Sequence, residues 1–164
     1  MQFYISSLGN PGAEYSKTRH NAGRISADAV CFENLDIDKV QIHYIVPDTY
    51  MNLSGEYIKK KLKNAKDGHV LVLIYDDIDI AMGDVKISFA RSSGGHNGVQ
   101  SVIDALGTAD FYRVRVGIGA KTHPEMLLQD YVLSQLKEDE ILLLKTTVRD
   151  KVIESVKEII KNCL

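Results

Sequence analysis

The chain leaves an apolar run and enters a compact polar turn at Leu8-Gly9-Asn10-Pro11-Gly12-Ala13-Glu14-Tyr15-Ser16-Lys17-Thr18-Arg19-His20-Asn21. Residues 3–8 are predicted to form a strand. Because proline fixes φ and glycine accepts positive φ, the Gly-Asn-Pro-Gly sequence predicts a tight turn at the end of that strand. Polar loops at strand ends are common ligand sites in α/β proteins, so the histidine here predicts a functional site. A plain connection with a solvated histidine is the alternative that this segment alone leaves open.

The composition is that of an ordinary globular chain. Its 164 residues suffice for one domain, residues 1–164, with a core that needs no disulfide. The net charge of −2 argues against a general nucleic-acid coat protein. Cys31 and Cys163 match no metal or redox spacing, so we expect free thiols. No signal peptide or membrane-spanning run is evident, and we expect a cytoplasmic protein.

Strand-like and helix-like segments alternate along the chain. Strands are predicted over residues 3–8, 40–46, 70–75, 84–91 and 113–118. Helices are predicted over residues 22–32, 52–64, 98–106 and 138–162, with Gly107 ending the third. The continuous apolar run 70–75 is typical of a strand buried on both faces. We therefore predict a single α/β domain with a mixed, mostly parallel twisted sheet and helices on both faces.

Basic residues gather in two groups. The first is interpreted as the solvated face of a helix and comprises Lys59, Lys60, Lys61, Lys63 and Lys66. The second, which is suited to phosphates despite the negative net charge, comprises Lys86, Arg91, Arg113, Arg115 and Lys121. Within residues 113–118 the arginines alternate with aliphatic residues, which predicts a strand with one apolar face and one cationic face in water.

Three further segments carry polar groups at the ends of predicted elements. Asn52 lies between a strand and a helix, where it would either cap the helix or face a ligand. The acidic motif 76–79 follows the buried strand directly and would form a turn, a cation site or part of an active site. The glycine-rich loop 92–98 opens a helix, and such loops bind anions through their backbone N–H groups.

These side chains favour hydrolysis by an activated water over a covalent intermediate. The chain has no P-loop pattern, no serine in a nucleophile elbow and no cysteine with a nearby histidine. His20 and one of Asp76, Asp77 or Asp79 would form a pair that activates water. The carboxamides that can donate to a carbonyl oxygen or oxyanion belong to Asn10, Asn21, Asn52 and Asn97. Together they predict ester hydrolysis without a metal or another cofactor.

Five motifs, in this order, resemble those of the bacterial-type peptidyl-tRNA hydrolases. They are residues 8–21, Tyr50-Met51-Asn52 with Ser54-Gly55, Asp76-Asp77-Ile78-Asp79, Gly94-Gly95-His96-Asn97-Gly98 and residues 111–119, and the likeness extends to residues 130–133. The resemblance implies hydrolysis of the ester between a peptide and the 3′ end of tRNA, which frees tRNA from abortive translation. It also implies an α/β domain that works as a monomer, without a metal and away from membranes.

The resemblance implies roles for particular residues. His20 would be the general base, Asp76 would hold its imidazole, and Asn52 would orient the water or stabilise the oxyanion. The implied substrate-binding residues are Asn10 and Asn97 on the peptide main chain, Tyr15 near the terminal adenosine, and Tyr50, Met51 and His96. The basic residues expected on the tRNA path are Lys86, Arg91 and Arg115.

The chain also departs from the family pattern. Ser7 replaces a usual glycine, Arg24 replaces an aromatic or small residue, and the loop before Gly94 contains fewer glycines. The segment 24–48 is shorter than is usual in the family, which leaves open whether an edge element of the sheet is missing. Two alternatives remain: a non-catalytic RNA-binding module, which would not need His20 and Asp76, and a metal-dependent hydrolase using the motif 76–79, which a chelator would inactivate.

Overall fold

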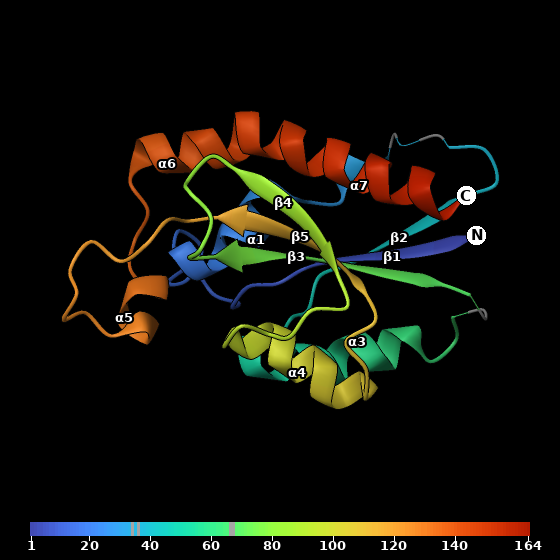
Figure 1. Ribbon diagram of the computed structural model, residues 1–164, viewed down its shortest axis with the longest axis horizontal. Coiled ribbons are helices and arrows are strands. Elements are labelled where there is room, and N and C mark those ends of the chain that lie inside the picture. Colours follow the sequence, from blue (N-terminus) through green and yellow to red (C-terminus); the bar gives the residue numbers. More distant parts are fainter. Residues whose placement is uncertain (34, 36, 66–67) are drawn as a thin grey trace.

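The computed structural model describes residues 1–33, 35, 37–65 and 68–164, and Lys66 of the first basic group lies outside them. Five strands form one sheet with helices on both faces (Figure 1). The strands are β1 (Gln2–Ser7), β2 (Gln41–Ile45), β3 (Val70–Asp77), β4 (Val85–Phe89) and β5 (Tyr112–Gly117). Their order is β2-β1-β3-β5-β4, with β4 antiparallel to β5 and the other pairs parallel. The predicted mixed, mostly parallel sheet is confirmed.

One face of the sheet is covered by helices from both ends of the chain (Figure 1). These are α1 (Ala22–Ser26), α2 (Val30–Glu33), α6 (Glu138–Leu143), a π-helical turn η3 (Leu144–Val148) and α7 (Arg149–Cys163). Their apolar side chains pack on alternate residues of the strands, such as Ile5, Ile74 and Val114. The short segment 24–48 therefore still supplies α2 and the edge strand β2.

The opposite face carries α3 (Ser54–Leu62), which follows the 3-10 turn η2 (Met51–Leu53), and α4 (Asn97–Leu106). The two helices approach closely, because a Cβ on Gly55 would overlap the carbonyl group of Ser101. Gly107 ends α4 with φ 71°, as predicted. The lysines at 59–61 and 63 are exposed, so for these described residues the solvated helix face is confirmed. Within the described residues, no helix combines the length and apolar character required to cross a bilayer.

The prediction of one helix over 22–32 is wrong. Ala27 has extended backbone angles that end α1. Asp28 accepts a hydrogen bond from the Cys31 backbone N–H at 3.2 Å, which supports a new turn before α2. The tail is likewise not one regular helix, because the π-helical turn η3 separates α6 from α7. A 3.6-residue periodicity does not reveal such a turn, since the apolar stripe continues across it.

The prediction that β5 exposes a cationic face to water is also wrong. Arg113 is fully buried and Arg115 is 8% exposed. The Arg113 guanidinium donates to the carbonyl of Ser92 at 2.8 Å and lies over the ring of Phe111. Burial lowers the pKa of Arg113, and contact with Tyr75 partly opposes this shift. The loop after β4 folds back over this edge of the sheet, which an alternating pattern within one strand does not indicate.

Ser7 and Tyr44 join β1 to β2 and to the end of α1. The Tyr44 hydroxyl donates to the Ala27 carbonyl at 2.7 Å, so the Ser7 hydroxyl donates to Tyr44 at 2.6 Å. Burial raises the pKa of Tyr44 to about 12, although the bond from Ser7 opposes the shift. The serine that replaces a usual glycine thus has a partner for its buried hydroxyl.

Tyr44→Phe should destabilise the fold by about 1–3 kcal/mol, because the buried Ser7 hydroxyl and the buried Ala27 carbonyl lose their hydrogen-bond partner. Urea unfolding measures this free energy, and Tyr57→Phe, on the opposite face of the sheet, is the control. Since the folded-state pKa exceeds that of the unfolded chain, the Tyr44 contribution should fall as the pH rises from about 10 to 12. An unchanged unfolding free energy in Tyr44→Phe would show that the network contributes nothing.

Candidate active site

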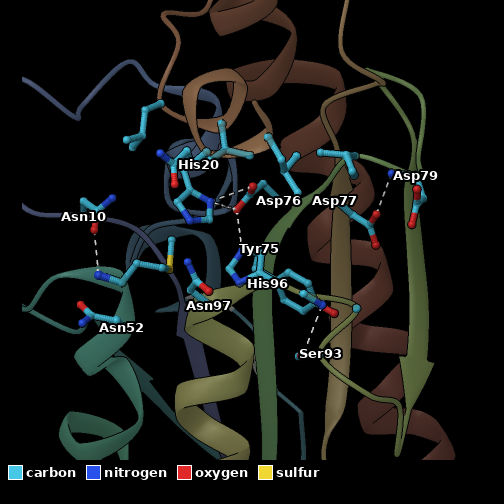
Figure 2. A pocket seen from close by; sticks show the side chains of 18 of the residues that line it. Asn10, His20, Asn52, Tyr75, Asp76, Asp77, Asp79, Ser93, His96 and Asn97 are labelled. Atoms are coloured by element: carbon cyan, nitrogen blue, oxygen red, sulfur yellow. Dashed lines mark hydrogen bonds and ion pairs between the residues drawn. The ribbon is translucent and has the colours of Figure 1, made fainter. Parts of the chain in front are cut away.

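A cleft of about 640 Å³ lies where the parallel strands end (Figure 2). Its lining comes from segments far apart in the sequence: the turn after β1, η1 (Arg19–Asn21), η2, the end of β3, the loop before α4, and α5 (Leu128–Val132). Parallel strands bring their carboxyl ends to one edge, which explains why these polar segments converge.

His20 lies in η1 and is 7% exposed on the floor of the cleft. Its Nδ1 is 2.9 Å from each carboxylate oxygen of Asp76, the first acidic residue after the apolar part of β3. A carboxylate can only accept hydrogen bonds, so Nδ1 carries the proton and the neutral ring has its free lone pair on Nε2. The structure therefore brings together the imidazole and one of the three candidate carboxylates, with the tautomer of a base.

Asp76 is buried and is also bonded to a second imidazole. His96 Nε2 donates to its Oδ1 at 2.8 Å. Burial alone would raise the pKa of Asp76. Electrostatic attraction to His96 and His20, together with the hydrogen bonds from both rings, instead lowers it to about 2. Asp76 thus remains ionised throughout the ordinary pH range.

Both ring nitrogens of His96 are engaged within the chain. While Nε2 binds Asp76, Nδ1 accepts hydrogen bonds from the backbone N–H groups of Gly98 and Val99 at 3.1 and 3.3 Å. The imidazole is therefore the N-cap of α4. These two N–H groups are not available to an anion, contrary to the expectation for a glycine-rich loop. We predicted from the sequence that His96 binds substrate, but neither of its ring nitrogens is free to do so in this arrangement.

Asn10 connects the turn after β1 to both neighbouring segments. Its backbone exchanges two hydrogen bonds with the Asn21 carboxamide, at 2.8 and 2.9 Å. Its Oδ1 accepts from the Met51 backbone N–H at 2.7 Å, which fixes the orientation of the amide. The Asn10 Nδ2 donor consequently lies toward His20 (Figure 2). Met51 itself is buried against Gly98 and contributes to the cleft wall.

Asn52 and Asn97 both line the cleft and are exposed. Asn52 does not cap α3, because that helix begins at Ser54 after Leu53; the capping alternative is therefore wrong. Tyr50 also lines the cleft and is 53% exposed. Tyr15 lies behind it, edge to face with ring centroids 6.1 Å apart, and thus supports the wall rather than lining it.

An apolar wall from α5 is the part of the cleft that the sequence did not predict. It consists of Leu128, Val132 and Leu133 beside Gln129. Arg19 holds this region against η1: it forms an ion pair with Glu140 at 2.9 Å and donates to the Ser134 hydroxyl at 3.1 Å. The exposure of leucines in a short helix is the only signal of this wall, and sequence alone does not report exposure.

The predicted tRNA-binding cations are placed differently from one another. Arg91 is exposed and lines the cleft, and Lys86 is exposed on β4 opposite Arg115. The Arg115 guanidinium, in contrast, is nearly buried in an ion pair with Asp77 at 3.0 Å. Arg91 and Lys86 are thus the better placed for an incoming phosphate.

The motif 76–79 does not converge on a cation. Asp77 binds Arg115 and accepts the backbone N–H of Asp79, while Asp76 points to the two histidines. Across the described ranges, the group of possible metal ligands is His20, Asp76 and His96, with ligand atoms within 4.8 Å of one another. A metal on His96 Nε2 would displace its proton to Nδ1, where two backbone N–H groups already donate. The group therefore suits hydrogen bonding better than metal binding.

The model of one protein family, described as peptidyl-tRNA hydrolase, matches residues 4–164. The chain belongs to this family. A peptidyl-tRNA hydrolase of Ureaplasma urealyticum is 39% identical, with 90% of this chain and 87% of that protein aligned. One from Thermodesulfovibrio yellowstonii is also 39% identical, over 95% and 89%. The crystal structure of the Acinetobacter baumannii peptidyl-tRNA hydrolase superposes with a TM-score of 0.73 at 26% identity, covering 97% of this chain and 88% of that one. None of these findings supports a non-catalytic module.

Asp76→Asn should lower kcat by about two to four orders of magnitude, because a neutral amide cannot balance an imidazolium and places an NH₂ donor where Asp76 Oδ2 accepts from His20 Nδ1. The acid limb of the rate profile should move to lower pH once the negative charge is lost. Initial rates across pH test both effects, with Asp84→Asn, a surface carboxylate paired with Lys151, as the control. An unchanged kcat would contradict the role given to this carboxylate.

Proposed function

We propose that this peptidyl-tRNA hydrolase family member cleaves the ester between a peptide and the 3′ end of tRNA by general-base attack of water. The proposal rests on the His20–Asp76 pair at 2.9 Å on the floor of a cleft lined by carboxamides. Membership of the family supports the substrate. The same reaction belongs to translation, which supports the expectation of a cytoplasmic enzyme, and we propose that it acts as a monomer.

His20 acts as the base through Nε2. It removes a proton from water as the oxygen attacks the ester carbonyl, and Asp76 stabilises the resulting imidazolium and keeps the ring oriented. The tetrahedral intermediate then collapses, the ribose oxygen leaves with a proton, and the peptide is released as a carboxylic acid. His96 is a positioning residue in this scheme, because it holds Asp76 from the other side.

The carboxamides hold the peptide and stabilise developing charge. Asn52 orients the water or donates to the oxyanion, a contribution of about 3–4 kcal/mol for a well-placed donor. Asn10 and Asn97 bind the peptide main chain, the former through the Nδ2 that its bond to Met51 aims at His20. Met51 contributes through its backbone N–H, which donates to Asn10 Oδ1 and so orients the Asn10 amide.

The tRNA end enters beside the aromatic and basic residues. Tyr50, supported by Tyr15, offers a ring for the terminal adenosine. Arg91 and Lys86 attract phosphates at the other side of the cleft, and Arg115 acts on the same path while paired with Asp77.

His20→Gln should lower kcat by at least about a hundredfold and leave tRNA binding nearly unchanged, because only the base is lost. The assay measures the release of an N-acetylated amino acid from tRNA, and His43→Gln, on the edge strand β2, is the control. EDTA should leave the wild-type rate unchanged. Near-normal turnover by His20→Gln would remove His20 from its role, and inactivation by EDTA would favour the metal-dependent alternative.

Arg91→Ala should raise KM about three- to tenfold at low salt and less at high salt, with little change in kcat, because a phosphate contact is screened by ions. Steady-state kinetics at 50 and 300 mM KCl test this expectation. Lys161→Ala, an exposed cation near the end of α7, is the control. A rise in KM that is equal at both salt concentrations would point to a damaged cleft instead.

A further inference from the structure

Arg24, the residue of α1 that departs from the family pattern, bridges two backbone segments beside the cleft. Its guanidinium donates to the Pro47 carbonyl at 2.8 Å and, more weakly, to the Ser7 carbonyl at 3.5 Å. The paired residues of β1 and β2 end at Ser6 and Ile45. Arg24 therefore connects the two chain segments just beyond the end of their hydrogen-bonded ladder.

Pro47 lies in the segment that leads from β2 to Asn52 in the cleft. Residues 46–50 are outside helices and strands, and they leave β2 at the edge of the sheet. Two hydrogen bonds hold this segment to the side of the cleft that carries the base. One is the guanidinium bond at Pro47, and the other runs from the Met51 backbone N–H to Asn10 Oδ1 at 2.7 Å. The place of Asn52 in the cleft depends on both anchors (Figure 2).

Both anchors are tied to the segment that carries His20. The Asn10 backbone exchanges two hydrogen bonds with the carboxamide of Asn21, the residue after His20. Arg24 follows in α1, the helix that begins directly after Asn21. Its side chain also packs on the turn after β1, since a Cβ on Gly9 would lie 3.1 Å from the Arg24 Nε. The two anchors thus connect the base to the segment on which Asn52 lies.

The surroundings of Arg24 suit a link between backbone segments. Among the described residues it forms no ion pair, and its hydrogen bonds go to backbone carbonyls. Burial lowers the pKa of Arg24, and Tyr44 and Asp48 partly oppose this shift. An aromatic or small side chain, as in the family pattern, has no comparable donor for the Pro47 carbonyl. The link is therefore a property of this chain.

We propose that Arg24 is a positioning residue that holds the segment 47–52, so that the Asn52 carboxamide is in place for the reaction at His20. This inference rests on the proposed function, in which Asn52 orients the water or donates to the oxyanion. Arg24 acts through the Pro47 carbonyl and not through the substrate. Because a displacement of about 1 Å in a reacting group costs up to about a hundredfold in rate, loss of one anchor should measurably lower kcat.

The test measures kcat and KM for N-acetylated aminoacyl-tRNA in Arg24→Met, alone and combined with Asn52→Ala. Arg24→Met keeps an unbranched side chain without a donor, and it should lower kcat about three- to tenfold while changing KM by less than about twofold. In the Asn52→Ala background the same substitution should lower kcat by less than about twofold, because the group that it positions is gone. Arg24→Lys retains a donor for the Pro47 carbonyl and should restore kcat to within about twofold of the wild type.

Arg149→Met is the matched control. The Arg149 guanidinium also lies against α1, where it donates to the Ile25 carbonyl at 3.3 Å and pairs with Asp28 at 3.1 Å. It makes neither of the bonds that anchor the segment 47–52, so its removal should leave kcat within about twofold of the wild type. Thermal unfolding of each variant confirms that it is folded. If Arg24→Met does not fold, Arg24→Gln, whose donor is too short to reach Pro47, takes its place in the cycle.

Three results would overturn the role of Arg24: an unchanged kcat in Arg24→Met, an equal loss with and without Asn52, or the same loss in Arg149→Met. A loss confined to KM would also overturn it, because it would indicate a contribution to substrate binding through Tyr50. Failure of the proposed function is distinguishable, since the wild type would then release no N-acetylated amino acid.

Discussion

The buried carboxylate of Asp76 is the interaction on which the active site depends. A charge in the interior is tolerated only when its hydrogen-bonding capacity is satisfied, and here two imidazoles satisfy it from different elements. His20 is presented by η1 and His96 by the start of α4, so three segments far apart in the sequence are fixed to one another through four atoms. These two imidazoles are the reason that the pKa of Asp76 is lowered to about 2 although the carboxylate is buried.

Close packing makes this arrangement possible. The start of α4, which carries His96, packs tightly against η2 and the end of β1, since a Cβ on Gly98 would overlap the Met51 side chain and lie 3.1 Å from that of Leu8. On the other side of the cleft, a Cβ on Gly23 would come within 2.7 Å of the Ile74 carbonyl, so α1 also lies directly on β3. Because Gly98 and Gly23 have no side chain, the segments next to His96 and His20 pack close enough for both rings to reach the end of β3. The Arg24 that departs from the family pattern adds a further link, from α1 to Pro47.

The sequence was sufficient to predict the sheet and the polar residues at its edge. It was insufficient to predict burial where segments far apart in the chain cover one another. Apolar runs followed by polar turns locate strand ends, which is why His20, Asp76 and Asn10 were expected together. Nothing in the alternating pattern of β5 shows that the loop after β4 covers and buries Arg113. The second partner of Asp76 was missed for a related reason: a histidine after two glycines carries no sign that its ring caps the helix that it precedes.

The π-helical turn η3 sets a rule for the length of the C-terminal segment. Buried residues recur every fourth position at Leu144, Val148, Val152 and Val156, and each such step overshoots a regular α-helical turn by about 40°. The wider turn absorbs part of this drift, so Ile141 and Val152 both face the sheet. Deleting one residue here would convert the wide turn into a regular α-helical turn and leave the two halves in nearly the same relative orientation, because the wide turn accommodates one extra residue. A one-residue deletion within α6 or α7 would instead rotate the apolar residues beyond it by about 100°, whereas residues 120–125, which are exposed and lie outside helices and strands, can change length without turning an apolar side chain to water.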